Sequence, residues 1–322
     1  MQILIFEWLT GGGLWIDGVS LHCGEEVRSQ GSRMLQAIAQ DFLVAGVEVI
    51  LPIDERVIGD FPEVAGLTLC PVSSEMDLRV FLKNLAEDVD RILLIAPETG
   101  ACLLNCVQWL ASFREKFVSP SEEFVRVTSS QQALFSCLQA QGFQGVSEGM
   151  VFVDFLNGPM DTFGFPMVIK PLDGVGGAGL RLIKDCEELD RLGRQFGDEL
   201  NGSSYWVEPF YQGLPVSVSV ICYGEGFTFL PATEQVFDRE PFGDFIGSRF
   251  PVHHDLACRA RRLAEKTIRL LPPTQGYVGL DMVLGAKVDQ LIEVNPRLTM
   301  SYLKLRDVCS FNLATRMLGP GS

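Results

Sequence analysis

The first 120 residues alternate short apolar runs with segments whose apolar side chains recur at helical spacing. The strand-like runs are residues 1–6, 47–53 and 91–97, and the helical segments are residues 33–45, 81–89 and 103–113. Strands that alternate with helices in this way form sheets whose strands are mostly parallel. The pattern therefore predicts a small α/β domain over residues 1–120.

The pattern changes after residue 120, where strands and helices no longer alternate regularly. Apolar runs predict strands at 151–156, 165–171, 205–210 and 216–223, and helical spacing predicts helices at 131–141, 186–196 and 259–271. The stretch 232–254 is expected to be rich in loops. We therefore expect two α+β lobes, over residues 121–205 and 206–322.

Residues 276–297, with the sequence GYVGLDMVLGAKVDQLIEVNPR, predict a β-hairpin near the end of the chain. With the turn centred on Lys287, Asp281 lies opposite Glu293, and Asn295 follows on the same face. Two opposed carboxylates repel each other unless one takes up a proton or a cation lies between them. Three hard oxygen donors without Cys or His favour Mg²⁺ or Mn²⁺ over zinc. The alternative is a polar face in solvent, and the apolar residues that flank the acids argue against it.

The composition narrows the classes of partner. With 47% hydrophobic and 21% charged residues, the chain is globular rather than disordered. A net charge of −15 argues against a nucleic acid or an anionic membrane as a partner, because both require a basic face. The nine cysteines form no CxxC pair, and no apolar run reaches the length of a membrane span. We therefore expect a cytoplasmic protein with reduced thiols, and no membrane or nucleic-acid partner.

Lys170 ends an apolar strand and is followed by a glycine-rich loop. An ammonium group at the end of a buried strand needs an anion or a route to water. The loop contains Gly174, Gly176 and Gly177, whose backbone N–H groups could close over phosphates. A glycine-rich hairpin turn has the same composition, so the loop alone leaves both interpretations open.

The segment WVEPFYQG, residues 206–213, has the character of a hinge because Pro209 interrupts an extended apolar strand. A purine needs a flat apolar slot with a donor and an acceptor at its edge. Glu208 and the backbone near Phe210 and Tyr211 could supply them. The alternative is a core strand with one acid that faces solvent.

The order of these features resembles the ATP-grasp superfamily. The matching segments are VIKPLDGVGGAGLRLI, VEPFYQGLPVSVSVI and GYVGLDMVLGAKVDQLIEVNPR, which cover about the last half of the chain. The resemblance implies two α+β lobes that clamp ATP, preceded by a Rossmann-like pre-ATP-grasp domain at residues 1–120. The segments FEW, GLPVSVSV and EVNPRLT are most similar to ligases that join tyramine to glutamate in methanofuran biosynthesis.

This resemblance implies a carboxylate–amine ligase that forms ADP and an amide bond through an acyl phosphate. Lys170 and the loop glycines would bind the phosphates of ATP, and the Glu208 hinge would bind adenine. Asp281, Glu293 and Asn295 would hold one or two Mg²⁺ or Mn²⁺ ions. Arg297 would stabilise the acyl phosphate and the oxyanion. The expected partners are a small-molecule amino acid and an amine, and a homodimer is one arrangement that the sequence leaves open.

Arg249 is a further catalytic candidate, because a guanidinium group pairs with a substrate carboxylate in bidentate geometry. Two departures from the superfamily pattern weaken the case for catalysis. Gln131 or Gln132 stands where relatives carry an ATP-contacting lysine, and Leu214 follows the hinge glycine where many relatives carry a ribose-binding acid.

Three alternatives follow for the function. The chain could bind a nucleotide with impaired catalysis, or it could ligate a different amino acid or a peptide. A dinucleotide oxidoreductase built on Gly11, Gly12 and Gly13 is disfavoured because these glycines lack the GxGxxG spacing.

Overall fold

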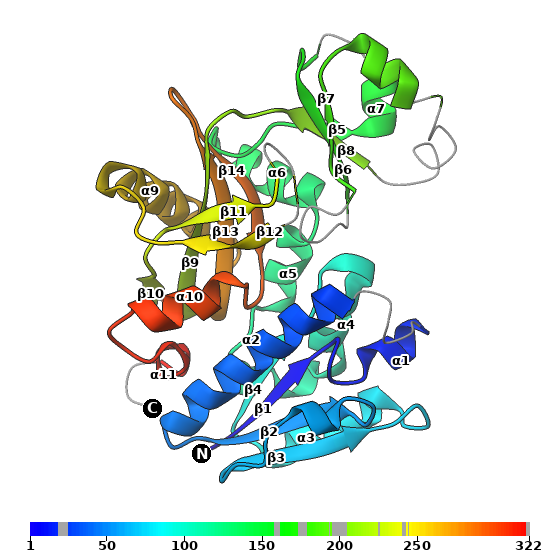
Figure 1. Cartoon of the computed structure of the whole chain (residues 1–322), viewed down its shortest axis with the longest axis vertical. Helices are drawn as coiled ribbons and strands as arrows, with labels where there is room; N and C mark the ends of the chain where they lie inside the picture. Colours follow the sequence, from blue (N-terminus) through cyan, green and yellow to red (C-terminus); the bar gives the residue numbers. More distant parts are fainter. Residues whose placement is uncertain are drawn as a thin grey trace.

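The structure is a computed structural model that describes residues 1–18, 25–157, 162–172, 179–192, 194, 205–224, 226–239, 243 and 245–319. Figure 1 shows an N-terminal domain at the bottom, a C-terminal lobe in the middle and a smaller central lobe at the top. Each of the three is built on one β-sheet. In the described ranges, none of the helices is both long and apolar enough to cross a membrane.

The N-terminal domain contains a parallel sheet in the order β3-β2-β1-β4. Its strands are β1 (Gln2–Glu7), β2 (Glu48–Asp54), β3 (Leu67–Val72) and β4 (Arg91–Ile95), and its helices are α1 (Gly13–Asp17), α2 (Glu25–Val44), α3 (Leu78–Asp88) and α4 (Cys102–Trp109). Short 3₁₀ turns lie at Ile58–Asp60, Thr99–Ala101 and Ala111–Lys116. Ile3 and Ile5 face one core with α2, whereas Leu4 and Phe6 face the other with α3 and α4. The expected α/β domain is confirmed, although the half-exposed strand β3 was not anticipated.

The central lobe contains a sheet in the order β5-β8-β6-β7 whose paired strands are antiparallel. The strands are β5 (Met150–Val151), β6 (Met167–Pro171), β7 (Arg181–Ile183) and β8 (Tyr205–Pro209), and α7 (Phe152–Asn157) covers one face. The expected strand at 151–156 is wrong beyond its first residue. Phe152 and Phe155 lie three residues apart and both enter the core of this lobe, which a helix allows.

The C-terminal lobe contains a sheet in the order β12-β11-β9-β13-β14, with β10 also paired to β9. The strands are β9 (Leu214–Tyr223), β10 (Gly226–Phe229), β11 (Thr233–Phe237), β12 (Phe245–Arg249), β13 (Gly276–Leu284) and β14 (Asp289–Asn295). The helices packed with them are α5 (Glu122–Thr128), α6 (Gln131–Ala140), α9 (His254–Leu270), α10 (Ser301–Val308) and α11 (Leu313–Met317). The stretch 232–254, expected to be rich in loops, contains the strands β11 and β12, which join the edge of this sheet through the backbone pairing of β11 with β9.

The domain boundaries expected from the sequence differ in two places from the packing. Phe124 of α5 and Leu134 of α6 enter the core beneath the C-terminal sheet, although the sequence assigns residues 121–140 to the central lobe. The expected boundary at residue 205 coincides with the start of β8, which pairs with β5 and β6 in the central sheet.

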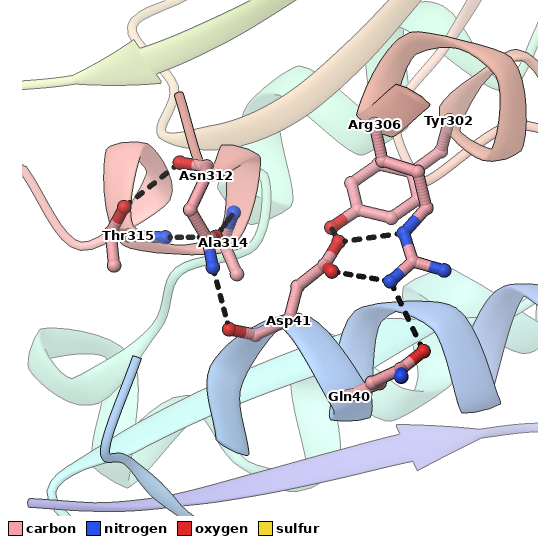
Figure 2. A network of polar contacts seen from close by, with 7 residues as sticks. All are labelled: Gln40, Asp41, Tyr302, Arg306, Asn312, Ala314 and Thr315. Atoms are coloured by element: carbon pink, nitrogen blue, oxygen red, sulfur yellow. Dashed lines mark hydrogen bonds and ion pairs between the residues drawn. The ribbon is translucent and has the colours of Figure 1, made fainter. Parts of the chain in front are cut away.

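The N-terminal domain and the C-terminal lobe share one hydrophobic core and a polar network around Asp41 (Figure 2). One Asp41 oxygen accepts hydrogen bonds from Tyr302 Oη at 2.5 Å and Arg306 Nε at 3.1 Å, and the other accepts from Arg306 Nη2 at 2.6 Å. The Asp41 carbonyl accepts from Asn312 Nδ2 at 2.7 Å. Helix α2 is therefore fixed to α10 and α11.

Replacing Asp41 by asparagine is expected to lower the free energy of unfolding by about 2 kcal/mol, because it removes the charge from a largely buried ion pair. Urea unfolding of the purified variant measures this change. Glu122→Gln is the matched control, because its pair with Arg126 is exposed and contributes about 0.5 kcal/mol or less. Equal losses in the two variants would contradict the interdomain role of Asp41.

Candidate active site

The β13–β14 hairpin places Asp281 directly opposite Glu293, which confirms the expected register. Asn295 lies opposite Gly279, two residues further along. A bulge between Asp281 and Met282 shifts the register of the rest of the hairpin by one residue. The hairpin turn itself lies within residues 285–288.

The three polar side chains contact one another at the end of the hairpin. Asn295 Nδ2 donates to Asp281 Oδ2 at 3.1 Å and to Glu293 Oε1 at 3.2 Å. Burial, followed by the charge of Glu293, raises the pKa of Asp281 to about 7. The pair therefore favours binding a proton or a cation between its oxygens.

The sheet around this pair has one apolar and one polar face. Its apolar face packs against α5, α6 and α9. On the polar face, Ser217 of β9 pairs with both Asp281 and Thr233, and Gln235, two residues after Thr233 on β11, lies on the same face. Thr233 Oγ1 is buried and has no hydrogen-bond partner in the described part of the chain. A ligand oxygen or water on this face would satisfy that hydroxyl group.

Arg297 connects the hairpin to the N-terminal domain. Its Nη2 donates to Asn295 Oδ1 at 3.4 Å, and its Nε donates to Glu98 Oε2 at 3.0 Å. Its Nη1 donates to the Leu298 carbonyl at 3.3 Å. Burial is the largest single influence and opposes the charged guanidinium. The charge and hydrogen bond of Glu98, together with the charges of Glu293 and Asp281, outweigh it, so the pKa of Arg297 is raised. The side chain is therefore a fixed cation between the two domains.

Lys170 and Glu208 form a buried ion pair in the central lobe, with Lys170 Nζ 2.8 Å from Glu208 Oε1. The second Glu208 oxygen accepts from Ser147 Oγ at 2.8 Å and from Trp206 Nε1 at 3.2 Å. The backbone N–H of Ser147 in turn donates to the Leu291 carbonyl of β14 at 2.8 Å. Glu208 therefore holds Lys170 in place, and Ser147 ties this pair to the strand that carries Glu293.

The remaining nucleotide-binding candidates lie around this pair or outside the described residues. The Phe210 N–H donates to the Pro166 carbonyl at 3.0 Å, and Tyr211 Oη accepts from the Glu148 N–H at 3.2 Å. Both residues directly follow the end of β8, and their part in binding adenine stays a prediction. Gly174, Gly176 and Gly177 lie outside the described residues.

Gln131 and Gln132, one of which stands where the superfamily pattern has an ATP-contacting lysine, lie at the start of helix α6. Gln131 is the first residue of α6 and is partly buried, whereas Gln132 is exposed. The helix is capped by Ser130, whose side chain accepts from the Ala133 N–H.

The structure does not bring Arg249 to the carboxylate pair. Arg249 pairs with Glu234 in the sheet, and this rung continues through Val216 to Met282, on the apolar face. Its guanidinium lies 2.8 Å from Glu234 and its side chain is 64% exposed. Asp281 lies on the opposite face, so a catalytic role for Arg249 finds no support in this geometry. Gln235, the residue after Glu234 on β11, lies on the face that carries Asp281.

The donors at the hairpin fit a hard divalent cation. Among the described residues, at the hairpin or away from it, no group of three or more His, Cys, Asp or Glu side chains could hold a metal ion. The hairpin instead combines two carboxylates with one amide. The amide now presents its nitrogen to the carboxylates, so Asn295 would turn to offer its oxygen to a cation. A divalent cation bound there would neutralise the negative charge of Asp281 and Glu293 and of a phosphate group.

Reasoning from the sequence missed Glu98, Ser147 and Thr233. Glu98 follows the buried strand β4, and an acid just beyond the carboxyl end of a parallel strand is a signal that could have identified it. Ser147 and Thr233 carry no such signal, since only the folded chain brings Ser147 to Glu208 and pairs Thr233 with Ser217, the neighbour of Asp281.

Two family models match the chain: an ATP-grasp domain at residues 159–301 and a pre ATP-grasp 3 domain at residues 47–124. Together they cover more than half of the 322 residues. The chain belongs to the ATP-grasp superfamily. The first match contains Lys170, Glu208 and the whole hairpin to Arg297, and the second contains Glu98.

Among curated proteins, this ATP-grasp chain is similar to a tyramine–L-glutamate ligase of Methanocaldococcus fervens. The two are 22% identical over 307 residues, which covers 95% of this chain and 89% of that protein. An ATP-grasp superfamily protein from Archaeoglobus fulgidus has a similar fold, with a TM-score of 0.71, 17% identity, and coverage of 99% of this chain and 88% of that chain.

An N5-carboxyaminoimidazole synthetase from Staphylococcus aureus, complexed with ADP, also has this fold. Its TM-score is 0.71 at 16% identity, with 98% of this chain and 76% of that chain covered. The expected ATP-grasp fold with its pre-ATP-grasp domain is therefore confirmed. The superfamily and the ligase relatives indicate an ADP-forming enzyme that makes a C–N bond.

Proposed function

We propose that this ATP-grasp enzyme uses ATP to join the carboxylate of glutamate to a primary amine, with tyramine or a related amine as the second substrate. The similarity to tyramine–L-glutamate ligases over 95% of the chain supports these substrates. A pathway of the methanofuran type stays a prediction.

The observation that carries the proposal is a continuous series of contacts across the domain interface. It runs from Asp281 and Glu293 through Asn295 to Arg297 and then to Glu98 of the pre-ATP-grasp domain. In this proposal the phosphate charge would lie near the hairpin acids, beside the fixed cation Arg297 at the interface. Ligases of this type need that adjacency, because the carboxylate that receives a phosphoryl group must then meet the amine.

Each side chain of the series has a distinct part in the proposal. Mg²⁺ or Mn²⁺ between Asp281 and Glu293 would neutralise phosphate charge. Lys170, oriented by Glu208, would contact the phosphates of ATP. Three of the five N–H groups of Arg297 are used in the bonds described, which leaves two to stabilise the oxyanion.

Release of ADP by the purified protein with ATP and Mg²⁺ tests the proposal. We expect release that depends on both glutamate and tyramine, together with a γ-linked or α-linked amide product identified by mass spectrometry. A panel of other amino acids and amines defines the specificity. The absence of ADP release with every pair would refute ligase activity.

A second candidate function is nucleotide binding with impaired catalysis. Two observations favour it: Gln131 begins α6 where relatives carry a lysine, and Lys170 is already paired with Glu208. Tight binding of ATP in calorimetry, without turnover of any substrate pair, would support this function. Turnover that disappears in the hairpin variants described below would exclude it.

A further inference from the structure

Glu98 lies at the carboxyl end of the parallel sheet, where ligands bind in open α/β sheets. The strand order β3-β2-β1-β4 reverses direction between β1 and β4, and such a switch point opens a crevice beyond the strand ends. Glu98 follows β4 on one side of this point, and Glu7 ends β1 on the other. The backbone then turns sharply at Ala101, with φ 57°, a conformation that is strained for any residue other than glycine.

The two oxygens of the Glu98 carboxylate have different surroundings. Oε2 accepts from Arg297 Nε at 3.0 Å, whereas Oε1 is buried and has no hydrogen-bond partner among the residues that the structure describes. The side chain is 11% exposed, so little bulk water reaches it. A buried carboxylate oxygen without a partner is unfavourable, and an ionised carboxylate can only accept hydrogen bonds. The missing partner is therefore a donor.

The place of Oε1 identifies the substrate that supplies this donor. The other oxygen of the same carboxylate bonds to Arg297, so a group on Oε1 lies next to the guanidinium that would stabilise the oxyanion. The reacting carboxylate of glutamate would be repelled there by Glu98. A primary amine instead brings N–H donors and, as an ammonium ion, a positive charge that matches the carboxylate.

We propose that Glu98 binds the nitrogen of the amine substrate through Oε1 while Oε2 holds Arg297. One carboxylate of the pre-ATP-grasp domain then positions both the nucleophile and the cation beside the carbonyl group. This inference rests on the proposed function, and it names a residue that determines specificity for amines.

Glu98→Gln tests the proposal, because its amide cannot accept hydrogen bonds through both of its terminal groups. We expect the KM for tyramine to rise about tenfold or more, while the KM values for ATP and glutamate change by less than about twofold. ADP release at varied concentrations of each substrate gives the three constants. Glu98→Asp keeps the charge but withdraws it by one methylene group, so it is expected to show the same selective rise and serves if the glutamine variant does not fold.

Two results would overturn the proposal. One is a fall in kcat with an unchanged KM for tyramine, which would limit Glu98 to holding Arg297. The other is a selective rise in the KM for tyramine in Asp41→Asn as large as that in Glu98→Gln. Asp41→Asn also loses an ion pair between the N-terminal domain and the C-terminal lobe, but at the α2–α10 contact, so an equal effect would be due to docking of the domains.

Trapping with hydroxylamine separates this proposal from the proposed function. Hydroxylamine converts an acyl phosphate to a hydroxamate, and because it is small and uncharged at neutral pH it does not need an ammonium-binding carboxylate. Glu98→Gln should therefore lose a smaller fraction of its rate of glutamyl hydroxamate formation at saturating hydroxylamine than of its kcat/KM for tyramine. No hydroxamate from wild type would refute the proposed function. Normal hydroxamate formation with an unchanged KM for tyramine in Glu98→Gln would refute only the role of Glu98.

Discussion

Asp281→Asn and Glu293→Gln are each expected to lower kcat for ADP release by about 10³-fold. Each change removes one of the two carboxylates that would hold the divalent cation against the phosphates of ATP, and such cations contribute several kcal/mol to stabilisation of transition-state charge. Steady-state ADP release with glutamate and tyramine measures the loss. Titration with Mn²⁺ in the presence of a non-hydrolysable ATP analogue should show weakened metal binding in both variants.

Asp289→Asn is the matched control for this pair. Asp289 lies on the same hairpin, but it forms an ion pair with Arg259 of α9 and is distant in register from Asp281. Its activity should stay within about threefold of wild type. A similar loss in all three variants would mean that the hairpin fold, rather than metal binding, had been disturbed.

The stability of Asp281→Asn should change in the opposite direction to its activity. The folded pKa of Asp281 lies at about 7, above its ordinary value of 3.8, so the folded state binds this proton more tightly than the unfolded state. The contribution of the Asp281 proton to the free energy of unfolding is therefore fully present below pH 3.8 and is lost as the pH rises toward 7. Without divalent ions at pH 8, thermal unfolding should show the variant to be at least as stable as wild type. A clearly lower Tm would contradict the electrostatic strain inferred for the pair.

Replacing Arg297 by lysine is expected to lower kcat by about 10²-fold with little change in the KM for ATP. Lysine keeps the positive charge beside Glu98, but it lacks the planar fork that reaches Glu98 and Asn295 at the same time. The lost donors act on the oxyanion, which forms only during the reaction, so the effect falls on kcat. Steady-state kinetics with each substrate varied separately measures it.

Arg306→Lys is the control for that change. Arg306 also joins the C-terminal lobe to the N-terminal domain through a carboxylate, Asp41, but it contacts none of the proposed site residues among its described partners. We expect a lower Tm with kcat within about threefold of wild type. A loss of kcat in Arg306→Lys as large as that in Arg297→Lys would show that interdomain docking, rather than the guanidinium of Arg297, limits the reaction.

The hairpin register was predictable because it depends on local rules. Side chains on a strand alternate between faces, and a hairpin turn fixes which residues face each other, so Asp281 and Glu293 could be paired from their numbers alone. The parallel sheet of the N-terminal domain followed in the same way from alternating strands and helices. The apolar run at 151–156 was ambiguous, because a short run without periodicity fits a strand or a buried helix, and packing in the central lobe selected the helix.

The sequence by itself determined the three sheet-building regions, the hairpin with its opposed carboxylates and the resemblance to ATP-grasp enzymes, because these depend on residue type and spacing. Tertiary structure decided the rest. It paired Glu98 with Arg297 across 199 positions of the chain, placed Glu208 on Lys170, and put Arg249 on the face away from Asp281. Such contacts depend on how separate domains and strands pack. Residues that lie far apart along the chain, as Glu98 and Arg297 do, leave no periodic signal in the sequence. The site is therefore specified locally at the hairpin and completed only where the pre-ATP-grasp domain meets it.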